Sequence, residues 1–166
     1  MNSTPISVSR LDTESFAEFG DVIETTDEAI EINQGTTLRF NDLANLDLVE
    51  NGGRPLINIF RATPLVLPIT VRLLERHPLS SQAFFPIDNR PYLVVVAPPA
   101  DKVQHNKIQA FLAHGRQGVN YHRGTWHHPL LALDKESDFI VIDRGADDEN
   151  CEEYWFTDSE LRTLEY

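Results

Sequence analysis

Two short segments of the chain concentrate side chains that bind metals or move protons. The denser segment runs from Gly118 to Pro129 and holds three histidines together with tyrosine, arginine and tryptophan. Its two glycines permit tight backbone geometry, and its aromatic rings, among them Trp126, can wall a pocket from water. His127 and His128 are adjacent, so on a strand they point to opposite faces. At most one of these two histidines is therefore expected to face a pocket.

The other segment runs from Glu75 to Gln82 and brings a carboxylate, an imidazole and an amide toward one strand end. Strand alternation predicts that the odd-numbered residues from Val71 to His77 share one face, which begins apolar and ends polar. Such a face, followed by the turn-like segment 78–81, resembles the mouth of a barrel, where ligands bind. The competing interpretation is a surface turn whose polar residues face water.

The spacing of these residues resembles that of the metal-binding cupins. Glu75, His77 and Gln82 resemble a degraded first cupin motif, and the segment from His122 to His127 resembles the core of the second. His77 and His127 are the strongest ligand candidates, and Glu75 and Gln82 are softer ones. An amide oxygen is a weaker ligand than a carboxylate, so this incomplete set predicts a divalent site of reduced affinity.

Arginines near predicted strand ends are candidates for binding a carboxylate, because a guanidinium group can grip both oxygens at once. Arg61 is the first candidate, followed by Arg72 and Arg123. The competing interpretation for each of them is a solvated surface residue.

The elements that must position these residues are mostly strands. A short helix is predicted over 12–19, with Asp12 or Thr13 as its cap and Gly20 as its stop. Many short strands after one helix favour a β-sandwich or barrel, and no helices of 10–15 residues alternate with them as a doubly wound fold requires. The predicted strand runs are 55–60, 69–74, 82–85, 92–97, 107–112, 125–133, 138–142 and 153–156.

Length and charge narrow the function classes further. A chain of 166 residues fits one domain, 1–166, and its formal net charge of -12 disfavours nucleic acid and anionic membrane surfaces as partners. We see no signal segment and no apolar run of 18 residues, which predicts a cytoplasmic protein. The single cysteine, Cys151, lies among carboxylates that disfavour a thiolate, so a nucleophilic role is not expected.

Four stretches together resemble the ureidoglycolate lyase family, and the resemblance covers nearly the whole chain. They are 60–62, 74–84, 92–97 and 118–130. The resemblance implies a mainly β, cupin-like barrel of the jelly-roll type with a few short helices, and a homodimer. It also implies a carbon–nitrogen lyase of the amidine-lyase type, which splits ureidoglycolate into glyoxylate and urea in allantoin degradation, a part of purine metabolism. The family is associated with a divalent metal such as Ni2+ and with no organic cofactor.

This reaction would need a base, an acid, a group that holds the carboxylate and charge stabilisation at the forming carbonyl oxygen. We expect His77 or His127 to act as the base, assisted by Glu75. Tyr121 or His122 is the expected acid. A divalent ion held by His77, Gln82 and His127 would chelate the hydroxyl and carboxylate groups and lower the hydroxyl pKa. The residues expected to bind substrate are Arg61, Arg72, Gln82 and Trp126.

Three other readings remain open at this point. A metal-cupin enzyme of another kind, such as a sugar isomerase or dioxygenase, would be favoured by an intact His/His/carboxylate set, which the sequence does not display. A non-catalytic sensor of a small acid would usually need an effector region, and no basic DNA-reading segment is present. A structural protein without a ligand would leave both polar segments without a purpose.

Overall fold

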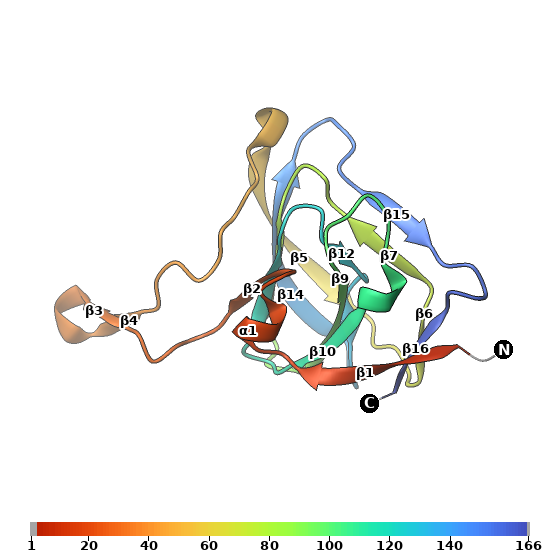
Figure 1. Ribbon diagram of the computed structural model, residues 1–166. Helices are drawn as coiled ribbons and strands as arrows, with labels where there is room; N and C mark the ends of the chain where they lie inside the picture. Colours follow the sequence, from red (N-terminus) through yellow and green to blue (C-terminus); the bar gives the residue numbers. More distant parts are fainter. Residues whose placement is uncertain (1–2, 166) are drawn as a thin grey trace.

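The computed structural model describes residues 3–165, which form strands with only short helical turns between them (Figure 1). The helical elements are α1 (Thr13–Phe16), η1 (Asn33–Gly35), η2 (Glu50–Gly52) and η3 (His105–Lys107). The strands are β1 (Thr4–Arg10), β2 (Gly20–Ile23), β3 (Ile30–Ile32), β4 (Thr37–Arg39), β5 (Arg54–Ala62), β6 (Ile69–Val71), β7 (Leu73–Arg76), β8 (Gln82–Pro86), β9 (Tyr92–Ala97), β10 (Gln109–Ala113), β11 (Gly118–Tyr121), β12 (Trp126–His127), β13 (Leu131–Ala132), β14 (Ser137–Gly145), β15 (Glu152–Trp155) and β16 (Arg162–Glu165). None of the helices in this part of the chain is long and apolar enough to cross a membrane.

Two curled sheets face one another and enclose the core (Figure 1). The larger sheet follows the order β15-β7-β12-β9-β10-β1-β16-β6, with β13 also paired to β9, and the smaller follows β2-β11-β8-β14-β5. Strand β9 is buried along its whole length, because the side chains on its two faces pack into two different apolar clusters. Tyr92, Val94 and Val96 pack between the sheets, whereas Leu93 and Val95 pack within the curl of the larger sheet.

Every predicted strand run contains strand residues, but two of the runs are interrupted. The run 69–74 divides at Arg72 into β6 and β7, and the run 125–133 divides into β12 and β13. The expected alternation from residue 71 to 77 is therefore wrong at its start, because Val71 and Leu74 are both fully buried in one cluster. The physical reason is that β6 pairs with β16 and β7 pairs with β12 and β15, so alternation restarts after the break.

The first helix is shorter than predicted. It spans one turn, α1, and the Asp12 carboxylate accepts a hydrogen bond from the Ser15 backbone N–H at 2.9 Å, which confirms Asp12 as the cap. Gly20 does not stop the helix, because it begins β2 instead. A Cβ atom at Gly20 would lie 2.0 Å from the Asn120 carbonyl oxygen, so glycine is required there for close approach of β2 to β11.

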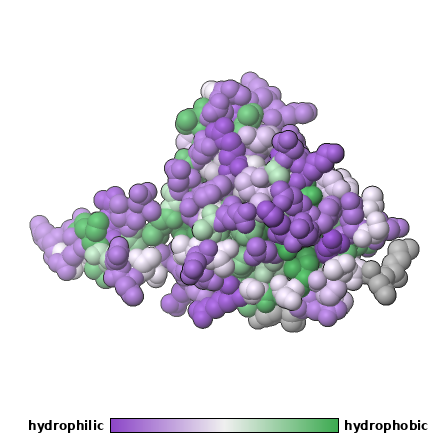
Figure 2. Space-filling view, in the orientation of Figure 1, coloured by the Kyte–Doolittle hydropathy of each residue, from purple (hydrophilic) through white to green (hydrophobic). Residues whose placement is uncertain are grey.

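An arm, residues 24–44, leaves the two-sheet body after β2 and carries the hairpin β3–β4 (Figure 1). Within the described part of the chain, these two strands pair only with each other. Neither this hairpin nor the strands β1, β2, β11 and β16 are among the predicted strand runs. Figure 2 shows apolar atoms exposed on the arm, where Ile30 and Leu38 are 53% and 60% exposed.

Candidate active site

His77 follows the end of β7, and its ring orientation is fixed by a backbone carbonyl group. Its Nδ1 lies 2.6 Å from the carbonyl oxygen of Asn150. Because a carbonyl oxygen only accepts hydrogen bonds, Nδ1 donates its hydrogen and Nε2 presents a lone pair. Nε2 lies 3.0 Å from the side-chain oxygen Oε1 of Gln82.

His127 is held in the same manner from β12. Its Nδ1 donates to the Thr125 carbonyl oxygen at 2.9 Å, and its ring stacks on Tyr121 with centroids 4.2 Å apart. Only 1% of the residue is exposed, and its Nε2 has no hydrogen-bond partner among residues 3–165. A buried lone pair without a partner is uncommon and indicates a site for a ligand or a proton.

Glu75 is the third member of the group. It lies opposite His127 in the β7–β12 register, so the strand pairing itself joins the two polar segments recognised in the sequence. Glu75 Oε1 lies 3.5 Å from His127 Nε2. One ligand atom from each of Glu75, His77 and His127 lies within 4.8 Å of the others. We call these three residues the triad.

The protonation states within the triad follow from its surroundings. Burial, followed by the charge of His127, lowers the pKa of His77, which keeps this imidazole neutral. Burial would raise the pKa of Glu75, but the interactions of its carboxylate with the neighbouring imidazoles of His127 and His77 outweigh burial. The net pKa shift of Glu75 is downward, so the carboxylate is ionised.

The triad fits a divalent metal ion. Two imidazole Nε2 atoms and an ionised carboxylate converge, and each imidazole is oriented by a carbonyl group that accepts its Nδ1 hydrogen, as is usual for metal-bound histidine. The expectation from sequence that no His/His/carboxylate set is present is wrong, because Glu75 completes one through β-sheet register. Gln82, predicted as a ligand, lies beside His77.

A pocket of about 480 Å³ opens beside the triad. Its lining residues are Phe60, Arg61, Ala62, Glu75, Gln82, Phe84, Pro129 and Leu130. Arg61 lies at its exposed rim, where Nε and Nη2 donate to the Asp138 carboxylate at 2.8 and 2.9 Å. These two bonds leave Nη1 of Arg61 for a ligand. The pocket therefore combines one cation with one ionised carboxylate.

Several residues predicted for the site lie elsewhere. Arg72 is exposed between β6 and β7, outside the pocket lining. The Nε2 of His122 lies 3.1 Å from Asp21 Oδ1, away from the triad residues. Trp126 is buried in the larger sheet's cluster, and its Nε1 donates to the Ala100 carbonyl oxygen. Tyr121 lies close to the site, but it stacks on His127 within the core between the sheets.

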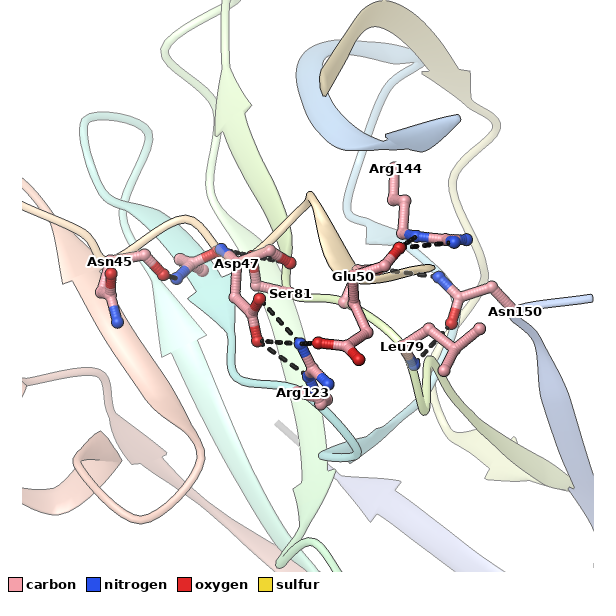
Figure 3. Close-up of polar contacts among 10 residues, drawn as sticks. Asn45, Asp47, Glu50, Leu79, Ser81, Arg123, Arg144 and Asn150 are labelled. Carbon is pink, nitrogen blue, oxygen red and sulfur yellow. Dashed lines mark hydrogen bonds and ion pairs between the residues drawn. The ribbon is translucent and has the colours of Figure 1, made fainter. Parts of the chain in front are cut away.

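Arg123 holds a chain segment in place (Figure 3). Its guanidinium group donates two hydrogen bonds of 2.8 Å to the carboxylate of Asp47 and lies 3.4 Å from a carboxylate oxygen of Glu50. In the same network, the side chain of Asn150 accepts a hydrogen bond from the Leu79 backbone N–H (Figure 3). Since Asn150 also orients His77 through its carbonyl group, this network positions the triad indirectly.

Sequence reasoning missed two polar residues inside the two-sheet body, Asn58 and Asp143. The Asn58 side-chain amide donates to Asp143 Oδ1 at 2.9 Å. Both residues occupy inward positions of strands that otherwise alternate as apolar runs. The sequence did offer a signal for Asp143. It follows Phe139 and Val141 in the alternation of β14, at a position where the pattern predicts an apolar residue.

Comparisons with known proteins agree on one family. A family model described as ureidoglycolate lyase matches residues 3–163. The chain is 54% identical over 163 residues to a ureidoglycolate lyase of Burkholderia mallei, covering 94% of this chain and 95% of that protein. It is 48% identical over 160 residues to a ureidoglycolate lyase of Pseudomonas putida, covering 96% of each.

A solved structure has a similar fold at low sequence identity. It is dTDP-4-dehydrorhamnose 3,5-epimerase from Elizabethkingia anophelis NUHP1, with a TM-score of 0.51 and 16% identity. The match covers 84% of this chain and 76% of that one. Together with the strand content, this likeness confirms the predicted mainly β, cupin-like fold, and at this identity it shows the fold alone.

Proposed function

The chain belongs to the ureidoglycolate lyase family, and from this premise we propose that it cleaves ureidoglycolate to glyoxylate and urea, as a step of allantoin degradation. The observation that carries the proposal is a single pocket lined by both Arg61 and the ionised carboxylate of Glu75. A cation suits the carboxylate of this substrate, and the half-buried carboxylate of Glu75 suits its hydroxyl group as a base.

The reaction moves one proton within the substrate. As the carbon–nitrogen bond breaks, the hydroxyl group becomes the aldehyde carbonyl group of glyoxylate and the departing nitrogen gains a proton to become urea. One carboxylate can accept the hydroxyl proton and then return it to the nitrogen. Glu75 is the member of the triad that lines the pocket, so we assign both transfers to its carboxylate.

Glu75 lines the pocket, whereas the two triad histidines are not among its lining residues. His127 is buried and lies opposite Glu75 in the β7–β12 register, with its Nε2 3.5 Å from Glu75 Oε1. Tyr121 in turn fixes the plane of the His127 ring by stacking. Phe60 and Phe84 pack edge to face and give the pocket an apolar wall.

Charge balance supports a bound cation as well. Glu75 and the nearby Asp143 are acidic, and a substrate that carries its own carboxylate would be repelled by them. A divalent ion such as Ni2+ held by His77, His127 and one oxygen of Glu75 would offset this charge and would lower the pKa of the substrate hydroxyl group, and the other oxygen of Glu75 would remain the base. Arg61, at the rim, remains the protein group that holds the substrate carboxylate.

The first prediction tests the activity itself. Purified protein is expected to release urea and glyoxylate from ureidoglycolate in equal amounts, because the cleavage forms one of each. Both products are measured over time, beside a His77→Ala variant in which release is expected to fall sharply. A protein that folds normally and yields neither product, with or without added divalent metal, would exclude the lyase assignment.

The proposed enzyme acts as one domain in the cytoplasm, where a reducing environment suits its single exposed thiol, Cys151. We further propose that it forms a homodimer through the outer face of the smaller sheet. Ile140 lies opposite Ile59 on one side and Phe85 on the other, so an exposed apolar row crosses β5, β14 and β8. Ile57, next along β5, is 77% exposed. Contiguous apolar surface of this kind is typical of protein interfaces.

The arm indicates that the partner is a second copy of the chain. A two-stranded hairpin is marginally stable in water by itself, and β3–β4 exposes Ile30 and Leu38 without a covering element among the described residues. If the arm of one copy lies against the sheet face of the other, both apolar surfaces are buried at once. The apolar surface of the arm and the apolar outer face of the smaller sheet can thus cover one another between two copies of the chain.

We expect Ile57→Asp to convert the dimer to a monomer, because an unpaired charge at an apolar interface costs several kcal/mol. Light scattering coupled to size-exclusion chromatography measures the mass of both proteins. Val66→Asp is the matched control, since Val66 is 87% exposed in a loop outside the apolar row and its variant should remain dimeric. A dimeric Ile57→Asp variant, or a monomeric parent, would contradict this interface.

A further inference from the structure

Asp143 is an acidic side chain inside the two-sheet body that the mechanism above does not use. It lies on β14 at the position that follows Phe139 and Val141 in the inward alternation, and both of these residues belong to the core cluster between the sheets. None of the ion pairs found within residues 3–165 involves Asp143. A half-buried carboxylate without a cation, beside a pocket, is a candidate for a functional site.

One side-chain amide donates to this carboxylate, and a second lies on the neighbouring strand. The Asn58 amide donates to Asp143 Oδ1 at 2.9 Å, and Gln82 neighbours Asp143 because Ala83 pairs with Ile142 in the β8–β14 register. Burial raises the pKa of Asp143, and the bonds from Gln82, the charge of His77 and the bond from Asn58 offset only part of this effect. A carboxylate offers about four acceptor positions, so two amides leave room for a ligand with N–H groups.

Asp143 is also adjacent to the pocket. Gln82 lines the pocket, its Oε1 lies 3.0 Å from His77 Nε2, and it neighbours Asp143 across the β8–β14 register. The row Asn58, Asp143 and Gln82 therefore forms a polar strip on the smaller sheet that faces the triad on the larger sheet. We call this row the amide–carboxylate strip.

We propose that the amide–carboxylate strip binds the ureido group of the substrate, with Asp143 accepting hydrogen bonds from its N–H groups. This inference rests on the proposed function. A ureido group presents several N–H donors and one carbonyl acceptor, which complement a carboxylate beside the donating amide of Gln82. The reverse orientation would place the substrate carboxylate against Asp143, where two anions repel, so the substrate carboxylate points to Arg61.

The assignment makes Asp143 a specificity residue for the ureido half of the substrate. In Asp143→Asn, one acceptor oxygen becomes an N–H donor that opposes the substrate's own donors. We expect the KM for ureidoglycolate to rise by about tenfold to a hundredfold, as for loss of a hydrogen bond to a charged group. Inhibition by glyoxylate, which has no ureido group, should be unchanged. Steady-state kinetics with glyoxylate as inhibitor measure both quantities.

Asp147→Asn is the matched control, because Asp147 is exposed in the loop after the same strand and the charge change is identical. Equal weakening of ureidoglycolate and glyoxylate, or an unchanged KM in Asp143→Asn, would overturn the proposal. If Asp143→Asn does not fold, Asn58→Ala should raise the KM in the same direction, and an unchanged KM there has the same consequence.

Failure of the lyase assignment can be distinguished from failure of this proposal. A parent protein that does not cleave ureidoglycolate would overturn the lyase assignment. In that case, binding of urea alone, followed by NMR chemical shifts, tests the strip directly. Shifts that urea causes in the parent and not in Asp143→Asn support the strip as a ureido site, and identical responses in the two proteins contradict it.

Discussion

Replacing Glu75 by glutamine is expected to lower the turnover of ureidoglycolate by about a hundredfold to ten-thousandfold, the usual contribution of a general base. Glutamine has nearly the same shape and fills the same place opposite His127 in the β7–β12 register. It cannot accept the hydroxyl proton, and its neutral amide cannot stabilise a cation held by the triad. The loss should therefore appear in kcat, measured by urea release at saturating substrate.

Glu149→Gln provides the comparison for this experiment, since Glu149 is an exposed acid in the loop before β15 and its variant should retain parental turnover. Thermal unfolding of the Glu75→Gln protein checks that its fold is intact. Turnover of Glu75→Gln within a few-fold of the parent would transfer the proton-moving role to another residue.

Much of the fold could be predicted from local patterns. Runs such as 92–97 and 138–142 are apolar and rich in β-branched residues, and both are strands. The pattern could not reveal that Arg72 interrupts one run, because the break depends on which strand pairs with β6 and which with β7. Nor could it reveal the arm, whose three-residue strands β3 and β4 pair only with each other among the described residues.

The sequence likewise predicted only part of the candidate site, because strand pairing cannot be read from local patterns. Residue types and spacing identified His77, His127, Glu75 and Gln82, and these residues come together in the structure. What spacing could not supply is register. The pairing of His127 with Glu75 is a property of the folded sheet, and it turns an incomplete motif into a His/His/carboxylate group.

Two residues that were predicted for the site because they lie near His127 in sequence lie elsewhere in the structure. His122 and Trp126 are close to His127 in sequence, yet the side chain of His122 faces Asp21. Trp126 packs in the apolar cluster of the larger sheet and donates to a backbone carbonyl oxygen. Adjacent residues diverge wherever the chain turns, as it does at Gly124 with its φ of 75°. Contacts between residues far apart in sequence determine where these side chains lie. For the same reason, only the folded structure shows that Asp143 lies beside the pocket.

His127→Ala is expected to weaken the binding of Ni2+ by at least about a hundredfold, because loss of even an outer partner of a metal ligand costs about tenfold to a hundredfold. The parent, freed of metal by a chelator, should bind one ion per chain, since the triad offers two imidazole lone pairs and one carboxylate. Isothermal titration calorimetry measures both affinities without reference to catalysis. His114→Ala is the matched control, as His114 is exposed and outside the pocket lining.

The design separates loss of a ligand from loss of structure. His127 is buried against Tyr121, so its replacement by alanine removes packing as well as a lone pair. His77→Ala removes the other imidazole from a less buried position and should weaken Ni2+ binding to a similar degree. Parental affinity in either folded variant would place the metal outside the triad. A parent that binds no Ni2+ would contradict the metal site and would leave the pocket-lining carboxylate of Glu75 as the proton-transferring group.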